Sequence, residues 1–333
     1  MHGRLKVRTT EEQRLLKEKE QQKKLTAYQT GMKQILSTRN PTSYDPKSFA
    51  ISAQLLVVNP DIYTLWNYRK EVILLELDKS KSECKDTIID NGICDEKSQE
   101  SLDVTKGLIK FLENEIRLTE QCLLANPKSY GSWHHRYWIM EHHPEPNWQN
   151  EFELCTKYLT MDDRNFHCWD YRRLILNKIG MSLEDEIKFS TERINVNFSN
   201  YSSWHYRSTL RKLDKDSLES EINLIMNAIF TDPADSSAWF YLRWVLSNPE
   251  MTEGHRKQLS QTLDQLLELE PDSKWCLLAK CWINGIKKGE NMNEDQIEEL
   301  TENYKKLLIL DPLRKGFYSH YLNALESKKL NNA

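Results

Sequence analysis

Glycine and proline are scarce in this sequence, with 10 of each among 333 residues. Both residues interrupt helices, so their scarcity, together with long helical patterns, favours an all-α chain. There is no run of about 18 apolar residues, which excludes a membrane-spanning helix. The N-terminus lacks the apolar segment of a secretory signal. The formal net charge of −4 provides no basic field for binding nucleic acid.

The cysteines show no pairing pattern. Seven are present, at positions 84, 94, 122, 155, 168, 276 and 281, without a CxxC pair. Disulfide frameworks of small secreted domains and zinc sites both use cysteines in characteristic numbers and spacings. We therefore expect reduced thiols in a cytoplasmic protein.

A tryptophan motif recurs along most of the chain. The sequence shows it in NPDIYTLWNYRKEV, NPKSYGSWHHRYW, DRNFHCWDYRRLI, NFSNYSSWHYRSTL, DPADSSAWFYLRWV and PDSKWCLLAKCWI. The intervals between these tryptophans are 67, 36, 35, 35 and 36 residues. A period near 35 is typical of arrays of helical hairpins, and the first interval is slightly short of two periods. A degenerate seventh unit, NYKKLLILDPLRKGFYSHYL, follows.

An amphipathic segment precedes the motif in each unit. In one of them Leu218, Ile222, Ile225, Met226 and Ile229 share a single helical face. Asn-Pro or Asp-Pro then ends this helix and suits the opening of a second one. We predict a right-handed α-α superhelix, a crescent-shaped solenoid of about seven hairpins, over residues 41–330. An N-terminal arm and helix occupy 1–40, and a polar insert at about 78–101 is predicted to be a surface loop.

Four units place an arginine three residues after the tryptophan, on the same face of a helix. Burying one tryptophan contributes roughly 4–6 kcal/mol at ~25 cal/mol per Å², before entropy is included. The arginine can bind a carboxylate or the helix-end carbonyl groups of the adjacent unit. We interpret this set as scaffold: Trp66, Arg69, Trp133, Arg136, Trp169, Arg172, Trp204, Arg207 and Trp239.

The repeats resemble those of protein prenyltransferase α subunits, from Phe49 to about Tyr321. Within that family, segments such as MHGRLKVRTTEEQ, PKSYGSWHHRYW and AWFYLRW are similar to the type II, or Rab geranylgeranyltransferase, branch. Nothing matches the immunoglobulin-like and leucine-rich repeat domains of vertebrate members, so we expect the minimal form. The resemblance implies a heterodimer in which a β subunit supplies the lipid pocket and most of a zinc site.

The resemblance also implies a reaction. A geranylgeranyl group passes from geranylgeranyl diphosphate to the C-terminal cysteines of Rab GTPases, which Rab escort protein presents. Zinc activates the acceptor cysteine as a thiolate, the competent nucleophile. Two alternatives stay open: the α subunit shared by farnesyltransferase and geranylgeranyltransferase type I, and a non-catalytic solenoid adaptor.

Lys128 is the strongest candidate for a catalytic role. It stands at a predicted helix start, where its ammonium group and the helix dipole both favour the negative charge that builds on a departing diphosphate. No other unit has a lysine after its proline, and the resemblance implies that this lysine contacts the diphosphate. Tyr130 is a weaker candidate for phosphate contact, because Tyr63 and Tyr201 share its repeat position and packing also explains it.

The resemblance implies further roles. Asn165 and His167 fall in a hairpin near the acceptor peptide. Gly131 stands where farnesyltransferase-type subunits carry a glutamine that holds a C-terminal carboxylate, which favours the type II branch. His2, in the basic N-terminal arm, is a candidate ligand to the zinc of the partner subunit.

His134 and His135 look like a metal-binding pair. Adjacent residues on a helix, however, point about 100° apart and rarely share one ion. We therefore interpret both histidines as contacts to neighbouring helices or to the partner.

Overall fold

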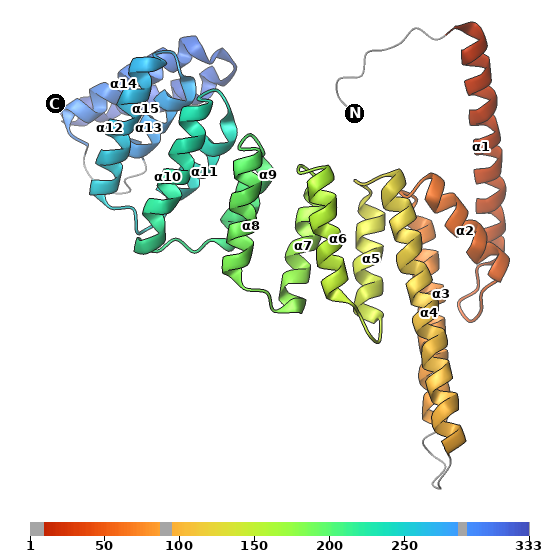
Figure 1. Cartoon of the computed structure of the whole chain (residues 1–333). Coiled ribbons are helices and arrows are strands. Elements are labelled where there is room, and N and C mark those ends of the chain that lie inside the picture. Colours follow the sequence, from red (N-terminus) through yellow and green to blue (C-terminus); the bar gives the residue numbers. More distant parts are fainter. Residues whose placement is uncertain (1–9, 87–94, 286–291, 333) are drawn as a thin grey trace. The chain divides into compact units, whose positions relative to one another are not determined.

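The computed structural model describes residues 10–86, 95–285 and 292–332, which form fifteen α-helices, one short 3-10 helix and no strand. After α1 (Glu11–Thr38), the helices follow as seven hairpins (Figure 1). The pairs are α2 (Pro46–Val58) with α3 (Tyr63–Asp86), α4 (Asp95–Ala125) with α5 (Tyr130–His142), α6 (Trp148–Met161) with α7 (Phe166–Ile179), α8 (Leu183–Val196) with α9 (Tyr201–Leu210), α10 (Lys215–Thr231) with α11 (Ser236–Leu246), α12 (Glu253–Leu269) with α13 (Lys274–Gly285), and α14 (Glu294–Leu310) with α15 (Lys315–Asn332). The predicted all-α chain of helical hairpins is confirmed.

The chain folds as two compact units. The first comprises the chain up to Lys157 together with His167–Ile179, and so holds α1 to α5 with most of α6 and α7. The second comprises Tyr158–Phe166 and the chain from Gly180 onward, which includes α8 to α15. Each unit has its own buried apolar core, with Leu56, Trp66 and Leu112 in the first and Trp204, Trp239 and Leu263 in the second.

The prediction that Asn-Pro or Asp-Pro ends the first helix of a pair is confirmed. Helices α2, α4, α10 and α14 each stop at the residue before such a dipeptide. The expectation that the proline also opens the second helix is wrong for most pairs. Helix α5, for example, begins at Tyr130, three residues after Pro127. The proline lies in the turn because its carbonyl group accepts a hydrogen bond from the tryptophan of the motif.

The polar insert at about 78–101 is not the loop that its composition suggested. Helix α3 continues to Asp86 and α4 begins at Asp95, so most of the insert lengthens these two helices. Residues 87–94 lie outside the described part of the chain. The prediction was wrong because lysine, glutamate and glutamine are good helix formers even where no apolar period is present.

Helix α1 is the helix expected within residues 1–40, and it runs from Glu11 to Thr38. Thr10 caps it in a capping box with Gln13, and it packs against α2 through its buried residues Gly31 and Ile35. Across the ranges that the structure describes, no helix combines the length and the apolarity needed to cross a membrane.

Candidate functional site

The tryptophans of the motif close the turns between paired helices. Each indole N–H donates to the carbonyl group six residues earlier, at 2.8–3.1 Å, in the pairs Trp66–Pro60, Trp133–Pro127, Trp204–Phe198 and Trp239–Pro233. The rings also reach the next hairpin: the ring centroid of Trp133 lies 5.2 Å from that of Tyr171, and that of Trp204 lies 5.0 Å from that of Tyr241. These contacts are those that a scaffold residue would make.

The arginines of the motif form buried ion pairs with the next hairpin. Nε and Nη2 of Arg136 each donate to Glu151 at 2.6 Å, and both side chains are at most 2% exposed. Nη1 of Arg136 donates to the carbonyl oxygen of Ile116 at 3.1 Å and to Oγ1 of Thr119 at 2.9 Å. The pairs Arg69–Glu115 and Arg207–Glu221 repeat this arrangement. The predicted carboxylate in the adjacent hairpin is confirmed for these three arginines. The carbonyl partner differs from the prediction: it lies within the first helix of the same hairpin rather than at a helix end of the next one.

A tyrosine is the third member of these clusters, and it was not predicted from the sequence. Oη of Tyr171 donates to Glu151 at 2.6 Å, and Oη of Tyr241 donates to Glu221 at 2.9 Å. Both tyrosines stand two residues after a motif tryptophan, and the glutamates stand 18 and 17 residues after the preceding ones at Trp133 and Trp204. The recurrence of a tyrosine and a glutamate at nearly constant distances from the motif tryptophans was the signal in the sequence that could have found them.

His135 takes the place of that tyrosine in the second hairpin. It is fully buried, its Nε2 lies 3.4 Å from Oε2 of Glu115, and its ring centroid lies 4.5 Å from that of Trp66. Burial lowers the pKa of His135, although the hydrogen bond to Glu115 opposes this. On the exposed side of α5, Nδ1 of His134 lies 3.2 Å from Nζ of Lys70 on α3. Both histidines thus make the expected contacts between helices.

Lys128 lies in the turn between α4 and α5, two residues before α5 begins. Its backbone N–H donates to Oδ1 of Asn126 at 3.2 Å. On either side, the carbonyl group of Pro127 accepts the Trp133 indole N–H at 2.8 Å, and Oγ of Ser129 donates to another turn at 3.1 Å. The main chain of this turn is fixed, while the side chain of Lys128 is exposed.

The structure brings Lys128, Tyr130 and His167 together in the first unit. The exposed ring of Tyr130 meets the His167 ring edge to face, with the centroids 4.1 Å apart. His167 is only 7% exposed and hydrogen-bonds with the Lys128 backbone. Burial lowers the pKa of His167 despite the nearby Asp170. His167 therefore supports the Lys128 turn from the next hairpin.

Asn165 belongs to the second unit and is fully buried. It directly precedes α7, as Asn200 precedes α9, and the side chain of Asn200 caps its helix by accepting the Ser202 N–H at 3.0 Å. Burial and position favour a structural role for Asn165. His2, which was predicted to be a ligand to the zinc of the partner subunit, lies outside the described residues.

Gly131 is required by packing. A Cβ atom added there would lie 2.6 Å from Nε1 of Trp66 and 3.0 Å from the carbonyl oxygen of Pro60. Contacts this short force a neighbour to shift, and both neighbours are held in the same hydrogen bond. The absence of a longer side chain at this position thus has a steric cause within the chain.

No group of three or more histidine, cysteine, aspartate or glutamate side chains is placed to hold a metal ion within the described ranges. Five cysteines of that part of the chain are buried free thiols, at positions 122, 155, 168, 276 and 281. Burial raises the pKa of Cys122, Cys276 and Cys281 to about 12. These three therefore stay protonated at neutral pH.

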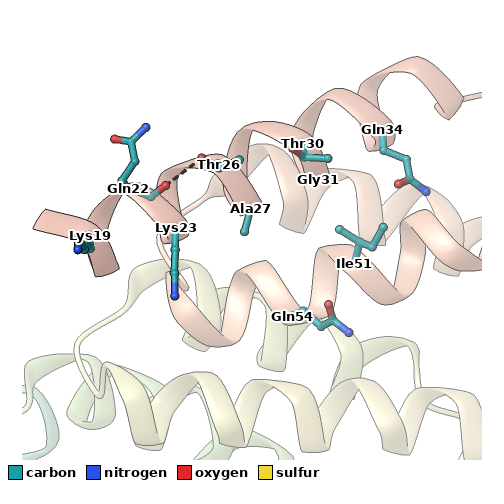
Figure 2. A pocket seen from close by; sticks show the side chains of 10 residues that line it. All are labelled: Lys19, Gln22, Lys23, Thr26, Ala27, Thr30, Gly31, Gln34, Ile51 and Gln54. Atoms are coloured by element: carbon teal, nitrogen blue, oxygen red, sulfur yellow. Dashed lines mark hydrogen bonds between the residues drawn. The ribbon is translucent and has the colours of Figure 1, made fainter. Parts of the chain in front are cut away.

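A separate groove of about 760 Å³ lies along α1 and α2 (Figure 2). The residues that line it are Lys19, Gln22, Lys23, Thr26, Ala27, Thr30, Gly31, Gln34, Ile51 and Gln54. None of the predicted site residues is among them, so the Lys128 turn and this groove are distinct features of the first unit.

Known proteins share both the repeats and the fold. A family model described as "Protein prenyltransferase alpha subunit repeat" matches residues 45–75, 112–143, 148–179, 183–212 and 218–249. A Dictyostelium discoideum protein named "Geranylgeranyl transferase type-2 subunit alpha" is 35% identical over 347 residues, which cover 98% of this chain and 100% of the relative. A Sus scrofa protein of the same name is 41% identical over 188 residues, 56% of this chain, but the chain spans only 29% of that relative's length.

A solved structure provides an independent comparison. A chain of Candida albicans protein geranylgeranyltransferase-I complexed with GGPP superimposes with a TM-score of 0.65 over 90% of each chain. The two sequences are 19% identical, so this likeness concerns the fold alone.

Proposed function

Because the chain belongs to the protein prenyltransferase alpha subunit family, we propose that it is the α subunit of a type 2 geranylgeranyl transferase. The Dictyostelium discoideum relative that it matches end to end carries this name. Together with a β subunit, the chain transfers geranylgeranyl from geranylgeranyl diphosphate to C-terminal cysteines of Rab GTPases that Rab escort protein presents. The reaction takes place in the cytoplasm.

The fixed turn that presents Lys128 is the observation that supports this proposal most directly. In the transfer, the acceptor cysteine sulfur forms a bond to C1 of the isoprenoid, the C1–O bond breaks, and diphosphate leaves with the electron pair. The thiol proton passes to solvent. Lys128 stabilises the charge that develops on the leaving oxygens, and the positive end of the α5 dipole adds to this. A main chain held on both sides fixes the point from which the Lys128 side chain extends, which reduces the reorganisation that the reaction requires.

Tyr130 and His167 have different parts in this proposal. Tyr130 is 58% exposed, and we assign its hydroxyl group as a donor to a phosphate oxygen. His167 is nearly buried beneath it, and we assign it to holding Tyr130 and the Lys128 backbone. Asn165, which is fully buried, takes no part in substrate contact in this proposal.

Zinc is assigned to the β subunit. The described residues of this chain do not fit a zinc site: no suitable cluster occurs among them, and their cysteines are buried thiols. We therefore derive no step through the metal from this chain. His2 stays a predicted ligand to the partner's zinc. If the zinc spectrum and the turnover of a His2→Ala heterodimer are unchanged, this prediction is wrong.

Two other functions were considered. The α subunit shared by farnesyltransferase and geranylgeranyltransferase type I is less favoured, because the relatives found are named type 2. A solenoid adaptor without catalytic function would use the same fold but would have no need for the ammonium group of Lys128.

The decisive experiment combines association with turnover. Co-expression with a prenyltransferase β subunit should yield a stable heterodimer by native mass spectrometry. Lys128→Ala should leave that heterodimer intact and lower its turnover by roughly 10–1,000-fold, the scale on which a charge-stabilising group acts. Lys212→Ala is the control, because Lys212 is exposed in the loop between α9 and α10. Normal turnover of the Lys128→Ala complex, or no association with a β subunit, would favour the adaptor.

A further inference from the structure

Asp61 is linked to Lys128 through one asparagine. Nδ2 of Asn126 donates to Oδ2 of Asp61 at 3.0 Å, and Oδ1 of the same amide accepts the backbone N–H of Lys128 at 3.2 Å. Asp61 lies in the turn before α3, and Lys128 lies in the turn before α5. Because an amide has its donor and its acceptor at opposite ends, the carboxylate of Asp61 fixes the direction in which Asn126 faces the Lys128 backbone.

In two other turns an aspartate stands at this position and accepts the N–H two residues later. Oδ1 of Asp162 accepts the Arg164 N–H at 3.1 Å, and Oδ1 of Asp232 accepts the Ala234 N–H at 2.9 Å. An ionised aspartate has no donor with which to bind a neighbouring turn. An asparagine at this position can therefore donate a hydrogen bond to a carboxylate of the preceding hairpin, which an aspartate cannot do.

The second unit contains a matched contact of the same kind. Asn197 occupies the repeat position of Asn126, seven residues before its tryptophan. Its Nδ2 donates to Oδ2 of Asp163 at 2.8 Å, again in the preceding turn. The turn after Asn197 carries Ser199 where the earlier one carries Lys128. The Asn197–Asp163 contact is therefore the control: it holds a turn in the same way, but that turn carries no lysine.

We propose that Asp61 is a positioning residue for the transfer reaction: through Asn126 it holds the Lys128 turn so that the ammonium group faces the departing diphosphate. The inference rests on the proposed function and adds a residue to its machinery. Asp61 carries the wrong charge to contact a diphosphate directly, so its contribution passes through the amide. The hydrogen bonds from Trp133 and Ser129 hold the same turn from other sides.

The first test compares three variants of the heterodimer. Asp61→Ala removes the acceptor, Asp61→Asn keeps an oxygen acceptor but loses the charge, and Asp163→Ala removes the matched contact. We expect kcat to fall on the order of 10-fold in Asp61→Ala, within the ~100-fold that a misplacement of about 1 Å can cause. Asp61→Asn should recover most of the loss, and Asp163→Ala should keep the wild-type kcat. An equal fall in Asp61→Ala and Asp163→Ala would overturn the proposal.

A double-mutant cycle tests the route through Lys128. In a Lys128→Ala background, Asp61→Ala should cause no further loss of kcat, because the group that it positions is already absent. If Asp61→Ala lowers kcat by the same factor in both backgrounds, Asp61 acts independently and the proposal is wrong.

Hydrogen exchange provides a readout that does not require activity. In the full chain, Asp61→Ala should speed amide exchange in the peptide from Lys128 to Trp133, whereas Asp163→Ala should speed it from Ser199 to Trp204 only. Unchanged exchange around Lys128 in Asp61→Ala would overturn the positioning role. A wild-type heterodimer that transfers no geranylgeranyl would instead contradict the proposed function, so the two failures are distinguishable.

Discussion

The indole N–H of Trp133 donates to the carbonyl oxygen of Pro127 at 2.8 Å. This bond joins the repeat scaffold to the turn that presents Lys128, since Pro127 is its immediate neighbour. The same bond closes turns that carry no lysine, as between Trp239 and Pro233. A structural device shared by the hairpins of Trp66, Trp133, Trp204 and Trp239 thus serves, in one of them, a residue proposed to act in chemistry.

Replacing Trp133 by phenylalanine should separate the effect of this bond on stability from its effect on turnover. Trp133→Phe keeps a ring but removes the bond to Pro127, which should lower the free energy of unfolding by about 1 kcal/mol and also lower turnover of the heterodimer. Trp239→Phe removes the equivalent bond in a turn without a lysine, so it should cost similar stability and leave turnover unchanged. Urea unfolding and steady-state kinetics of both variants check this. Equal turnover in the two variants would show that the Trp133 bond does not serve Lys128.

Glu151→Gln should be strongly destabilising. Arg136 is fully buried, and its guanidinium group makes two 2.6 Å bonds to Glu151. Losing the Glu151 carboxylate leaves only the more exposed Glu120, 3.3 Å from Nη2 of Arg136, to balance this buried charge, at a cost of about 3–5 kcal/mol. Glu141→Gln is the control, because Glu141 and its partner Lys178 are each 38% exposed and such pairs contribute about 0–1 kcal/mol. Comparable losses in urea unfolding would contradict this prediction.

Gly131→Ala and Gly107→Ala should have opposite effects. At Gly131 the added methyl group meets Trp66 Nε1 at 2.6 Å, so overpacking should cost about 1–3 kcal/mol. At Gly107, within α4, nothing lies within 4 Å of the added atom. There alanine should stabilise by about 0.5–1 kcal/mol, because it loses less conformational entropy on folding. Thermal unfolding of the two variants shows directly whether each substitution raises or lowers stability.

His135 should make stability fall in mildly acidic solution. Burial holds its folded pKa below the ordinary value of 6.5, so the unfolded chain binds the proton more readily. The stabilisation is therefore complete above about pH 6.5 and is lost as pH falls from there towards the folded pKa. His135→Gln cannot titrate, and it should flatten the dependence of the unfolding free energy on pH in this window. Substitution of the exposed His320 by glutamine is the control; an unchanged slope in His135→Gln would refute the prediction.

Most of the fold was predictable from local patterns. The tryptophan spacing predicted the hairpins, and the Asn-Pro and Asp-Pro dipeptides marked the ends of first helices. The insert at 78–101 was misread because a helix can form without an apolar face where its residues favour helix. The site was predictable in part: Lys128 stood out as the single exception to a repeat, and the structure places Tyr130 and His167 beside it.

The sequence by itself determined the all-α class and the number of hairpins, because period and helix-breaking residues act over short distances along the chain. Only the tertiary structure decided which polar groups meet. The contact of Asn126 with Asp61 joins residues 65 positions apart, and the steric limit at Gly131 is set by Trp66, at the same separation. Such contacts depend on how one hairpin packs against the next, and that geometry has no counterpart in a local pattern.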